Sequence, residues 1–402
     1  MSKVSGVEFS GPLESYASGL DAQLSRLGYT PGSAEAQLRL LAHLSRWLAE
    51  EGLAAVALTP QVVESFVAVR WAAGYRIHRS PAALAWLLDY LRDLAVLGPP
   101  AAAEPTPLEA LLDRYRNYLT GQRGLAASSV RVYVGAVRPF LAGRMAGEGL
   151  DLERLTAGDV IAFVLEACSE RRTGKAKTAV TAPRSLLGFL HLEGMAAASL
   201  AAAVPSAASW RLAGLPRGLE PDEVDRLLAA RDRSTVAGRR DAAILSLLVR
   251  LGLRAGEVAG LELDDIDWRA GQLVVRGKGD RHERLPLPDD VGRAVVGYLR
   301  DGRPATAQGR CLFVRLAAPY RRLTSGAVSA AVFAAGQRAG LGTVRAHRLR
   351  HTAATRMLAA GAGLTEIGQL LRHRKASTTA IYAKVDRDAL SILARPWPGG
   401  VR

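Results

Sequence analysis

The sequence has few cysteines and no long apolar run. Two of its 402 residues are cysteine, Cys168 and Cys311, too few for a disulfide framework or a four-cysteine zinc site and usual for a reducing cytoplasm. The first residues show no apolar signal-peptide core, and no stretch of about 18 apolar residues follows. We therefore expect a cytoplasmic protein that is neither secreted nor membrane-spanning. With 49% hydrophobic and 23% charged residues, disordered, collagen-like and coiled-coil chains are excluded.

Acidic residues are also in short supply, because 38 Asp and Glu face 53 Lys and Arg, for a net charge of +15. The excess is uneven: residues 1–105 carry 8 basic and 10 acidic residues (−2), residues 106–214 carry 13 and 9 (+4), and residues 215–402 carry 32 and 19 (+13). A basic domain of this kind indicates a polyanion partner, nucleic acid first. The plainer alternative is an arginine-rich composition that favours solubility.

Lysine is the scarce cation, with six copies among 53 basic residues. One of them, Lys278, lies in the glycine-bearing turn 277–282. A lysine can lend a proton in chemistry, whereas an arginine stays charged and suits phosphate oxygens. Lys278 is thus a candidate proton donor, with a solvated turn residue as the alternative.

The length predicts two or three domains, since single cores stop growing near about 250–300 residues. Two stretches, 97–107 and 201–218, have the composition of linkers, the first with four prolines. They divide the chain into an N-terminal domain at 1–96, a second domain at 108–200, a third at 219–395 and a tail at 396–402.

The first two domains resemble each other. Leu58-Thr59-Pro60 and the residues after it parallel Leu155-Thr156-Ala157 at an offset of 97, and each threonine is placed as the N-cap of an amphipathic helix. These repeats predict two tandem all-helical domains of about four helices each. The alternative is chance similarity between helices rich in Ala and Leu.

The third domain mixes helices with a small sheet. Helices are predicted from Leu219 and, nearly apolar all round, from Asp241. Arg254 and Glu257 follow, one helical turn apart. Residues 272–276 and 283–287 read as the strands of a hairpin, and helical periodicity resumes at Ser325. The whole chain is therefore predicted as mainly α with a small antiparallel β-sheet in the third domain.

A cluster of chemistry-bearing residues lies near the end. On one helix, His347, Arg350 and His351 share a face, and His373 and Tyr382 come later. His347 and His351, spaced i and i+4, suggest a metal site as an alternative. However, no acidic residue lies between the two histidines, and the neighbouring arginines would repel a divalent cation. Arginine, histidine and tyrosine together suit a phosphate attacked by the tyrosine, with cations bracing the developing charge. The alternative for Tyr382 is a buried core aromatic.

Residues 106–395 resemble the tyrosine site-specific recombinases, or phage integrases. The motifs that carry the resemblance are Gly252-Leu-Arg254-Ala-Gly-Glu257-Val, Arg276-Gly-Lys278-Gly, His347-Arg-Leu-Arg350-His351-Thr, and Leu371-Arg-His373 through Ile381-Tyr382.

The resemblance implies a role for each motif residue. Arg254 and Arg350 would clamp the scissile phosphate, Tyr382 would be the nucleophile, and His373 would hydrogen-bond a nonbridging oxygen. Lys278 would protonate the leaving 5′ oxygen and His347 would take the tyrosine proton, with His351 in support.

It also implies an architecture and an activity: two tandem helical SAM-like domains, of which 108–200 would clamp DNA, followed by a catalytic domain. The enzyme would cleave and rejoin double-stranded DNA recombination sites through a 3′-phosphotyrosyl link, without metal, ATP or another cofactor. It would do so for integration, excision, resolution or transposition of a mobile element. The partners would be a homotetramer joined through the C-terminal tail and accessory or partner recombinase proteins. The alternatives are a type IB topoisomerase and a non-catalytic DNA-binding relative.

Two features depart from the family pattern. Arg372 stands where a glycine most often precedes the histidine, and it adds a cation near the site. The extra domain at 1–96 is the other, and its role stays open between a second DNA clamp or arm-binding domain and protein contacts in the assembly.

Overall fold

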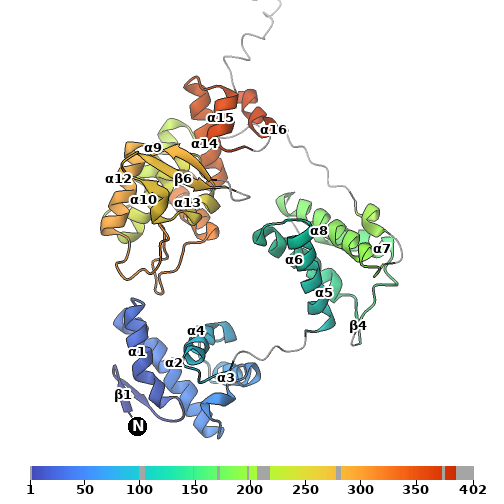
Figure 1. The fold of residues 1–402 in the computed structure, drawn as a ribbon, viewed down its shortest axis with the longest axis vertical. Helices are drawn as coiled ribbons and strands as arrows, with labels where there is room; N and C mark the ends of the chain where they lie inside the picture. The colour runs from blue at the N-terminus through green and yellow to red at the C-terminus, as the bar shows by residue number, and fades with distance from the viewer. Residues whose placement is uncertain are drawn as a thin grey trace, which may run out of the picture. The chain divides into compact units, whose positions relative to one another are not determined.

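The computed structural model describes residues 2–98, 105–147, 149–169, 173–196, 199–205, 218–277, 282–373 and 376–385. The chain forms two compact units, Met1–Gly98 with Leu212–Arg402, and Pro99–Arg211. Helices dominate, with short antiparallel strands between them (Figure 1), which confirms the predicted fold class. Within the described ranges, no helix is long and apolar enough to cross a membrane.

The segment 2–98 is built on four helices around its own core. They are α1 (Ala17–Arg26), α2 (Pro31–Glu50), α3 (Pro60–Ala72) and α4 (Pro81–Asp93). The hydroxyls of Thr30 and Thr59 cap α2 and α3, and each helix has proline in its first turn, where the missing N–H is no loss. Leu38, Leu41, Phe66 and Leu87 are fully buried in this core.

The expectation of an all-helical first domain is wrong in one detail, because β1 (Ser2–Val4) pairs with β2 (Val7–Phe9) as an antiparallel hairpin. Its turn residues Ser5 and Gly6 both have positive φ (44° and 84°). Two left-handed residues match the twist of a two-residue hairpin loop, so the Ser-Gly pair between short apolar strands was the sequence signal.

The second unit repeats the helical plan. Its helices are α5 (Pro107–Asn117), α6 (Ala127–Ala142), α7 (Ala157–Ser169) and α8 (Thr173–Leu192), with a π-helical turn at Tyr118–Gln122. The Thr156 hydroxyl accepts from the Asp159 N–H at the start of α7, so both predicted threonine caps form. The repeat is inexact: Pro81 begins α4, whereas Pro183, which follows it by 102 residues, lies inside α8.

Two details of the second unit differ from expectation. A minimal hairpin, β3 (Met145–Ala146) with β4 (Gly149–Leu150), interrupts the helices. The start of the predicted linker 201–218 also belongs to the domain, because the 3₁₀ segment η4 (Leu200–Ala203) leads to Val204, which is buried in the core of this unit. Val204 is accompanied in this core only by the partly buried Leu200 and Ala201 of the same segment, an apolar pattern too short to be predicted from the sequence.

The segment 218–385 carries the largest core. Its first helices are α9 (Pro221–Ala229), α10 (Val236–Arg250) and the short α11 (Ala255–Gly260), and α12 (Asp289–Asp301) and α13 (Ser325–Arg338) follow the sheet. Helix α10 is buried from Asp241 to Val249, as its continuous apolar sequence predicts. It therefore forms the centre on which α12, α13 and α14 (Ala346–Ala359) pack.

The sheet has three antiparallel strands in the order β5–β6–β7: β5 (Ile266–Asp267), β6 (Gln272–Arg276) and β7 (His282–Pro286). In the predicted hairpin Val274 pairs with Arg284 and Arg276 with His282. Leu273 and Val275 face the core, and their neighbours do not, as alternation along a strand requires. Strand β5 was not predicted because two residues give no periodic signal.

The chain then folds into a small terminal cluster. It contains α15 (Leu364–Leu370), α16 (Ala376–Thr379) and the 3₁₀ segment η6 (Ala380–Val385). Tyr382 is buried there against Ala354, Ile367 and Leu371. The tail 396–402 lies outside the described residues.

Candidate active site

Helix α14 places an arginine and two histidines on one face. Arg350 is buried, and its guanidinium donates to the carbonyl oxygens of Gly252 (Nη1, 2.7 Å) and Leu371 (Nη2). These carbonyls fix the guanidinium without neutralising it. Burial, and then the nearby charge of Arg254, lower the pKa of Arg350 to about 10, so it stays cationic at neutral pH.

Gly252 makes this arrangement possible. It has φ of 59°, and a Cβ there would lie 2.5 Å from Leu371 Cδ2 and 3.2 Å from the Ala353 side chain. Only glycine fits this conformation and this close approach to α14. The loop after α10 can therefore run against α14 and deliver Arg254 beside Arg350.

Arg254 is held from the other side by a carboxylate. Glu257, at the third position of α11, accepts from the Arg254 backbone N–H (2.8 Å) and from Arg254 Nη1 (2.5 Å). The same buried carboxylate accepts from Arg372 Nη2 at 2.7 Å. Although burial opposes ionisation, Arg372 and Arg254 together hold the pKa of Glu257 below its usual value. One carboxylate therefore orients two arginines.

Arg372 ends α15 in a left-handed conformation, with φ of 56°. Its N–H donates to the Gln369 carbonyl, and the His373 N–H donates to the Gly368 carbonyl. This pattern is a Schellman helix end, where glycine is the usual residue. The geometry explains why a glycine is expected before His373, and the ion pair with Glu257 is what the arginine adds.

A cavity of about 600 Å³ opens beside these side chains, and Arg254, His347 and Arg350 line it together with Arg345. No aspartate or glutamate of the described chain lines it. Burial, followed by the charges of Arg350 and Arg254, lowers the pKa of His347, so the imidazole is neutral above that pKa. The cavity thus combines fixed positive charge with a neutral base, which suits a phosphate diester.

Tyr382 lies next to this group with its hydroxyl on a histidine. Its Oη is 2.9 Å from Nδ1 of His351, and the ring of His351 meets that of His347 edge to face at 4.5 Å. Burial raises the pKa of Tyr382, with Arg350 acting in the opposite direction. Burial and the neighbouring His347 lower the pKa of His351 to about 4. A neutral His351 can therefore accept the hydrogen of the tyrosine.

His373 completes the cluster. Its ring stacks with the Tyr382 ring at 6.4 Å, and its Nδ1 is 2.7 Å from the hydroxyl of Thr379. Burial and then the charges of Arg350 and Arg254 lower its pKa to about 4. With Nδ1 engaged by Thr379, Nε2 is the ring atom left to serve a ligand.

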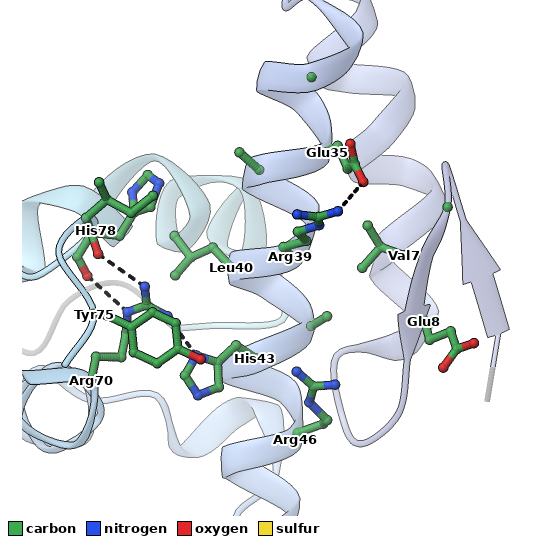
Figure 2. A pocket seen from close by; sticks show the side chains of 15 residues that line it. Val7, Glu8, Glu35, Arg39, Leu40, His43, Arg46, Arg70, Tyr75 and His78 are labelled. Carbon is green, nitrogen blue, oxygen red and sulfur yellow. Dashed lines mark hydrogen bonds and ion pairs between the residues drawn. The ribbon is translucent and has the colours of Figure 1, made fainter. Parts of the chain in front are cut away.

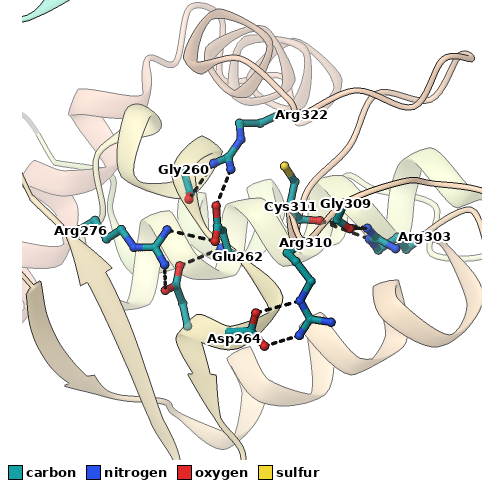
Figure 3. A network of polar contacts seen from close by, with 10 residues as sticks. Gly260, Glu262, Asp264, Arg276, Arg303, Gly309, Arg310, Cys311 and Arg322 are labelled. Carbon is teal, nitrogen blue, oxygen red and sulfur yellow. Dashed lines mark hydrogen bonds and ion pairs between the residues drawn. The ribbon is translucent and has the colours of Figure 1, made fainter.

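The end of β6 that leads into the hairpin turn is held by ion pairs. Arg276 contacts Glu262 (3.3 Å) and the buried Asp265 (2.9 Å), and Glu262 also accepts from Arg322 (2.6 Å) (Figure 3). Lys278 lies outside the described residues, two positions beyond Arg276. The anchored strand end fixes where that turn begins.

The structure thus brings together five of the six predicted site residues: Arg254, His347, Arg350, His373 and Tyr382. Sequence reasoning gave His351 only a supporting place, yet it is the histidine bonded to Tyr382. It also missed Thr379 and the sharing of Glu257 by two arginines. The i+3 spacing of Glu257 from Arg254 was a usable signal, whereas nothing in the sequence pairs Thr379 with His373.

Comparison with known proteins agrees with this geometry. The model of the phage integrase family matches residues 217–388, and that of the phage integrase N-terminal SAM-like domain matches residues 112–201. A protein of Sinorhizobium fredii named as the integrase/recombinase y4rA is 38% identical over 97% of this chain and 95% of its own. This chain belongs to the phage integrase family.

Other members of the phage integrase family support the same conclusion. Tyrosine recombinase XerD of Mycobacterium tuberculosis is 34% identical over 69% of this chain and 94% of its own length. The crystal structure of a lambda integrase dimer bound to a COC′ core site shares the fold, with 19% identity, a TM-score of 0.53, and coverage of 85% of this chain and 89% of that one. The protein is therefore a tyrosine recombinase, an enzyme that transfers DNA strands.

Proposed function

We propose that this recombinase cleaves each DNA strand by attack of Tyr382 Oη on the scissile phosphate. The Oη–P bond forms and the P–O5′ bond breaks, which leaves a 3′-phosphotyrosyl link and a free 5′ hydroxyl. The 5′ hydroxyl of the partner strand then attacks that link and restores tyrosine, so the bond energy is conserved. The observation that carries the proposal is the hydrogen bond of Tyr382 to His351, whose ring contacts that of His347 in the cavity lined by Arg254 and Arg350.

Each remaining residue supplies charge or a proton in this scheme. The phosphate oxygens are stabilised by the guanidinium groups of Arg254 and Arg350 and by Nε2 of His373. The paired imidazoles of His347 and His351 receive the tyrosine proton, and Lys278 returns one to the leaving 5′ oxygen. No step calls for ATP or a metal.

The substrate we propose is duplex DNA carrying recombination sites of a mobile element. Support comes from the +13 charge of residues 215–402 and from related structures described as bound to DNA, such as XerH with difH, which is 17% identical at a TM-score of 0.51. We further propose that four copies act on two sites in the cytoplasm, joined through the segment after Tyr382, with accessory or partner recombinases where the sites demand them.

The nucleophile is tested by trapping. A nicked duplex carrying the ends of the element, which loses its 5′ fragment after cleavage, should accumulate a covalent 3′ adduct that peptide mapping places on Tyr382. Tyr382→Phe should bind the same DNA normally and form no adduct, because the ring is kept and the hydroxyl is removed. An adduct in that variant would refute the assignment.

Lys278 is tested with a substrate whose leaving 5′ oxygen is replaced by sulfur. A thiol leaves without protonation far more readily than an alcohol, because its pKa is near 8.5. Lys278→Ala should therefore be slow on the oxygen substrate and near the wild-type rate on the sulfur substrate. Equal defects on both would assign Lys278 to DNA binding instead.

A further inference from the structure

The segment 2–98 has a surface rich in arginine and exposed aromatic side chains. We call it the N-terminal basic face, and its residues lie on α2, on α3 and on the loop before α4. They are Arg39, Arg46, Arg70, Trp71, Tyr75, Arg76 and Arg79. No part of the proposed chemistry uses this surface.

The N-terminal basic face is positively charged, although residues 1–105 as a whole are not. Residues 1–105 sum to −2, yet five of their eight basic residues belong to the N-terminal basic face. No acidic residue occurs between Glu64 and Asp89. The negative total of residues 1–105 therefore conceals a local positive surface.

Arg70 is the structural centre of this face. It is 4% exposed, and no carboxylate of the described chain pairs with it. Its guanidinium donates to the carbonyls of Ile77 (3.1 Å) and His78 (3.2 Å), contacts Nδ1 of His43 (2.7 Å), and lies 4.0 Å from the centroid of the Tyr75 ring. A buried guanidinium without a counter-ion is costly in water-excluded surroundings, so an anion placed nearby would be favoured.

Arg70 also orders the loop that follows α3. His78 has φ of 52°, a conformation that non-glycine residues rarely adopt, and Arg70 holds its carbonyl in place. From the same helix, the Trp71 indole N–H donates to the Arg79 carbonyl (3.2 Å), and the Arg79 guanidinium lies 3.4 Å from the Trp71 ring centroid. The loop is thus prearranged, and the side chains of Trp71 (58% exposed) and Arg76 are both exposed to solvent.

A cavity of about 580 Å³ adjoins the loop (Figure 2). The cavity is lined by basic side chains together with the carboxylates of Glu8 and Glu35. The basic side chains are those of Arg39, Arg46, Arg70, His43 and His78. Glu35 forms an ion pair with Arg39 at 2.7 Å. Arg46 is exposed and has no ion pair among the described residues. An unpaired arginine, Arg46, in a cavity that also holds the exposed aromatic Tyr75 matches the way proteins hold a nucleic-acid backbone.

We propose that the N-terminal basic face binds the phosphate backbone of duplex DNA, apart from the DNA held at the catalytic cavity. Arg46 and Arg76 contact phosphates, and the Trp71–Arg79 stack with Arg70 beneath holds the loop in its binding shape. This inference rests on the proposed function, because it gives the segment 2–98 a second contact with duplex DNA, the proposed substrate.

The test uses the full-length protein and a pair of matched double variants. Arg46→Ala with Arg76→Ala removes two charges from the face, and Arg26→Ala with Arg92→Ala removes two from elsewhere in the same segment. Binding to a duplex carrying the recombination site is measured by fluorescence anisotropy over a series of salt concentrations. Each lost phosphate contact should lower the slope of log K against log salt by about 1.

In the face variant we expect the slope of log K against log salt to be smaller in magnitude by about 2, and the affinity at 0.1 M salt to fall on the order of tenfold. The control variant should match wild type in both quantities. Equal effects in both variants, or none in either, would overturn the proposal. A changed sedimentation behaviour of the face variant with unchanged DNA binding would overturn it too and assign the face to a protein contact.

The same samples separate this inference from the proposed function. At saturating DNA the face variant should still form the Tyr382 adduct at the wild-type rate, since it keeps every residue of the catalytic cavity. A wild-type salt slope in the face variant, together with a normal adduct, rejects only the N-terminal basic face. Failure of wild type to form any adduct rejects only the proposed chemistry.

Discussion

At the scale of single residues, Arg372 combines an unfavourable backbone with a favourable side chain. Its left-handed φ of 56° suits glycine, while its guanidinium shares the buried Glu257 with Arg254. A left-handed conformation costs a residue with a Cβ about 1–2 kcal/mol, and the ion pair offsets this. The same contact fixes the carboxylate that positions Arg254.

Substitutions at Arg372 separate the two contributions. Arg372→Gly and Arg372→Ala both lose the ion pair, but only glycine relieves the backbone. We expect the glycine variant to be more stable than the alanine variant by about 1 kcal/mol in urea unfolding. Equal stability would show that the left-handed backbone carries no strain.

The kinetic consequence is distinct from stability. Without Arg372, Glu257 neutralises Arg254 more fully, so the phosphate is held by less positive charge. Single-turnover adduct formation should slow about tenfold in Arg372→Gly, with DNA affinity within about twofold, and Arg372→Lys should recover part of the rate. A glycine variant that cleaves at the wild-type rate would contradict this positioning role.

The histidines of the site predict how stability depends on pH. Folding lowers the pKa of His351 and of His373 to about 4, mainly by burial, from an ordinary value near 6.5. Between these values the unfolded chain binds more protons than the folded one, so stability is complete above about pH 6.5 and falls as the pH drops toward 4.

His351→Gln should make this dependence shallower, because one of the depressed groups is removed. Urea unfolding of wild type and variant at pH 7.5, 6 and 5 measures it. Parallel curves for the two proteins would mean that His351 is not held neutral by the fold.

At the scale of elements, the β6–β7 hairpin connects the body of the domain to the turn that bears Lys278. Arg276, the last residue of β6, is held by Glu262 and by Asp265, which is 4% exposed. The ion pairs of Arg276 lie within the described residues, and Lys278 lies outside them. The strand that precedes Lys278 in the sequence therefore ends at a fixed position.

Arg276→Ala should therefore impair the proton-donating step more than DNA binding. We expect slower cleavage of the ordinary substrate and recovery on the substrate with a 5′ sulfur, as for Lys278→Ala. Arg310→Ala is the matched control, because Arg310 pairs with Asp264, whereas Arg276 is held by Glu262 and Asp265 (Figure 3). A defect in Arg276→Ala that sulfur does not relieve would exclude this anchoring role.

The helices and the hairpin were predictable because their signals are local. Thr59 and Thr156 cap helices with their own side chains, and the apolar run in α10 needs a buried position whatever surrounds it. Contacts across long sequence distances gave no such signal. The pairing of His351 with Tyr382, 31 residues apart, and of Arg372 with Glu257, 115 apart, depends on how α11, α14 and α15 pack.

The resemblance named the residues Arg254, His347, Arg350, His373 and Tyr382, and the fold gathers them. It could not assign the hydrogen bond of the tyrosine, since His347 and His351 occupy one helical face and differ only by a turn. It also left Arg372 as an anomaly, because the requirement for φ near 56° and the partner Glu257 are properties of the folded chain. Spacing predicts which residues share a face but not which of them meet another element.

At the scale of the whole molecule, the described residues form separate cores. Leu248 is fully buried in the core of residues 219–349, and Leu141 is fully buried in that of residues 111–204. The two leucines belong to different compact units. A chain of this length with independent cores is expected to unfold in more than one step.

Calorimetry with paired leucine substitutions tests that independence. Leu141→Ala and Leu248→Ala each remove the same atoms from a fully buried site, which costs about 2–5 kcal/mol. Each should lower one unfolding transition and leave the other at its wild-type temperature, because the deleted contacts lie within one unit. A single transition that moves with either substitution would mean that the units unfold as one. Separate transitions would allow the segment that matches the SAM-like domain to engage DNA without altering the stability of the segment that carries Tyr382.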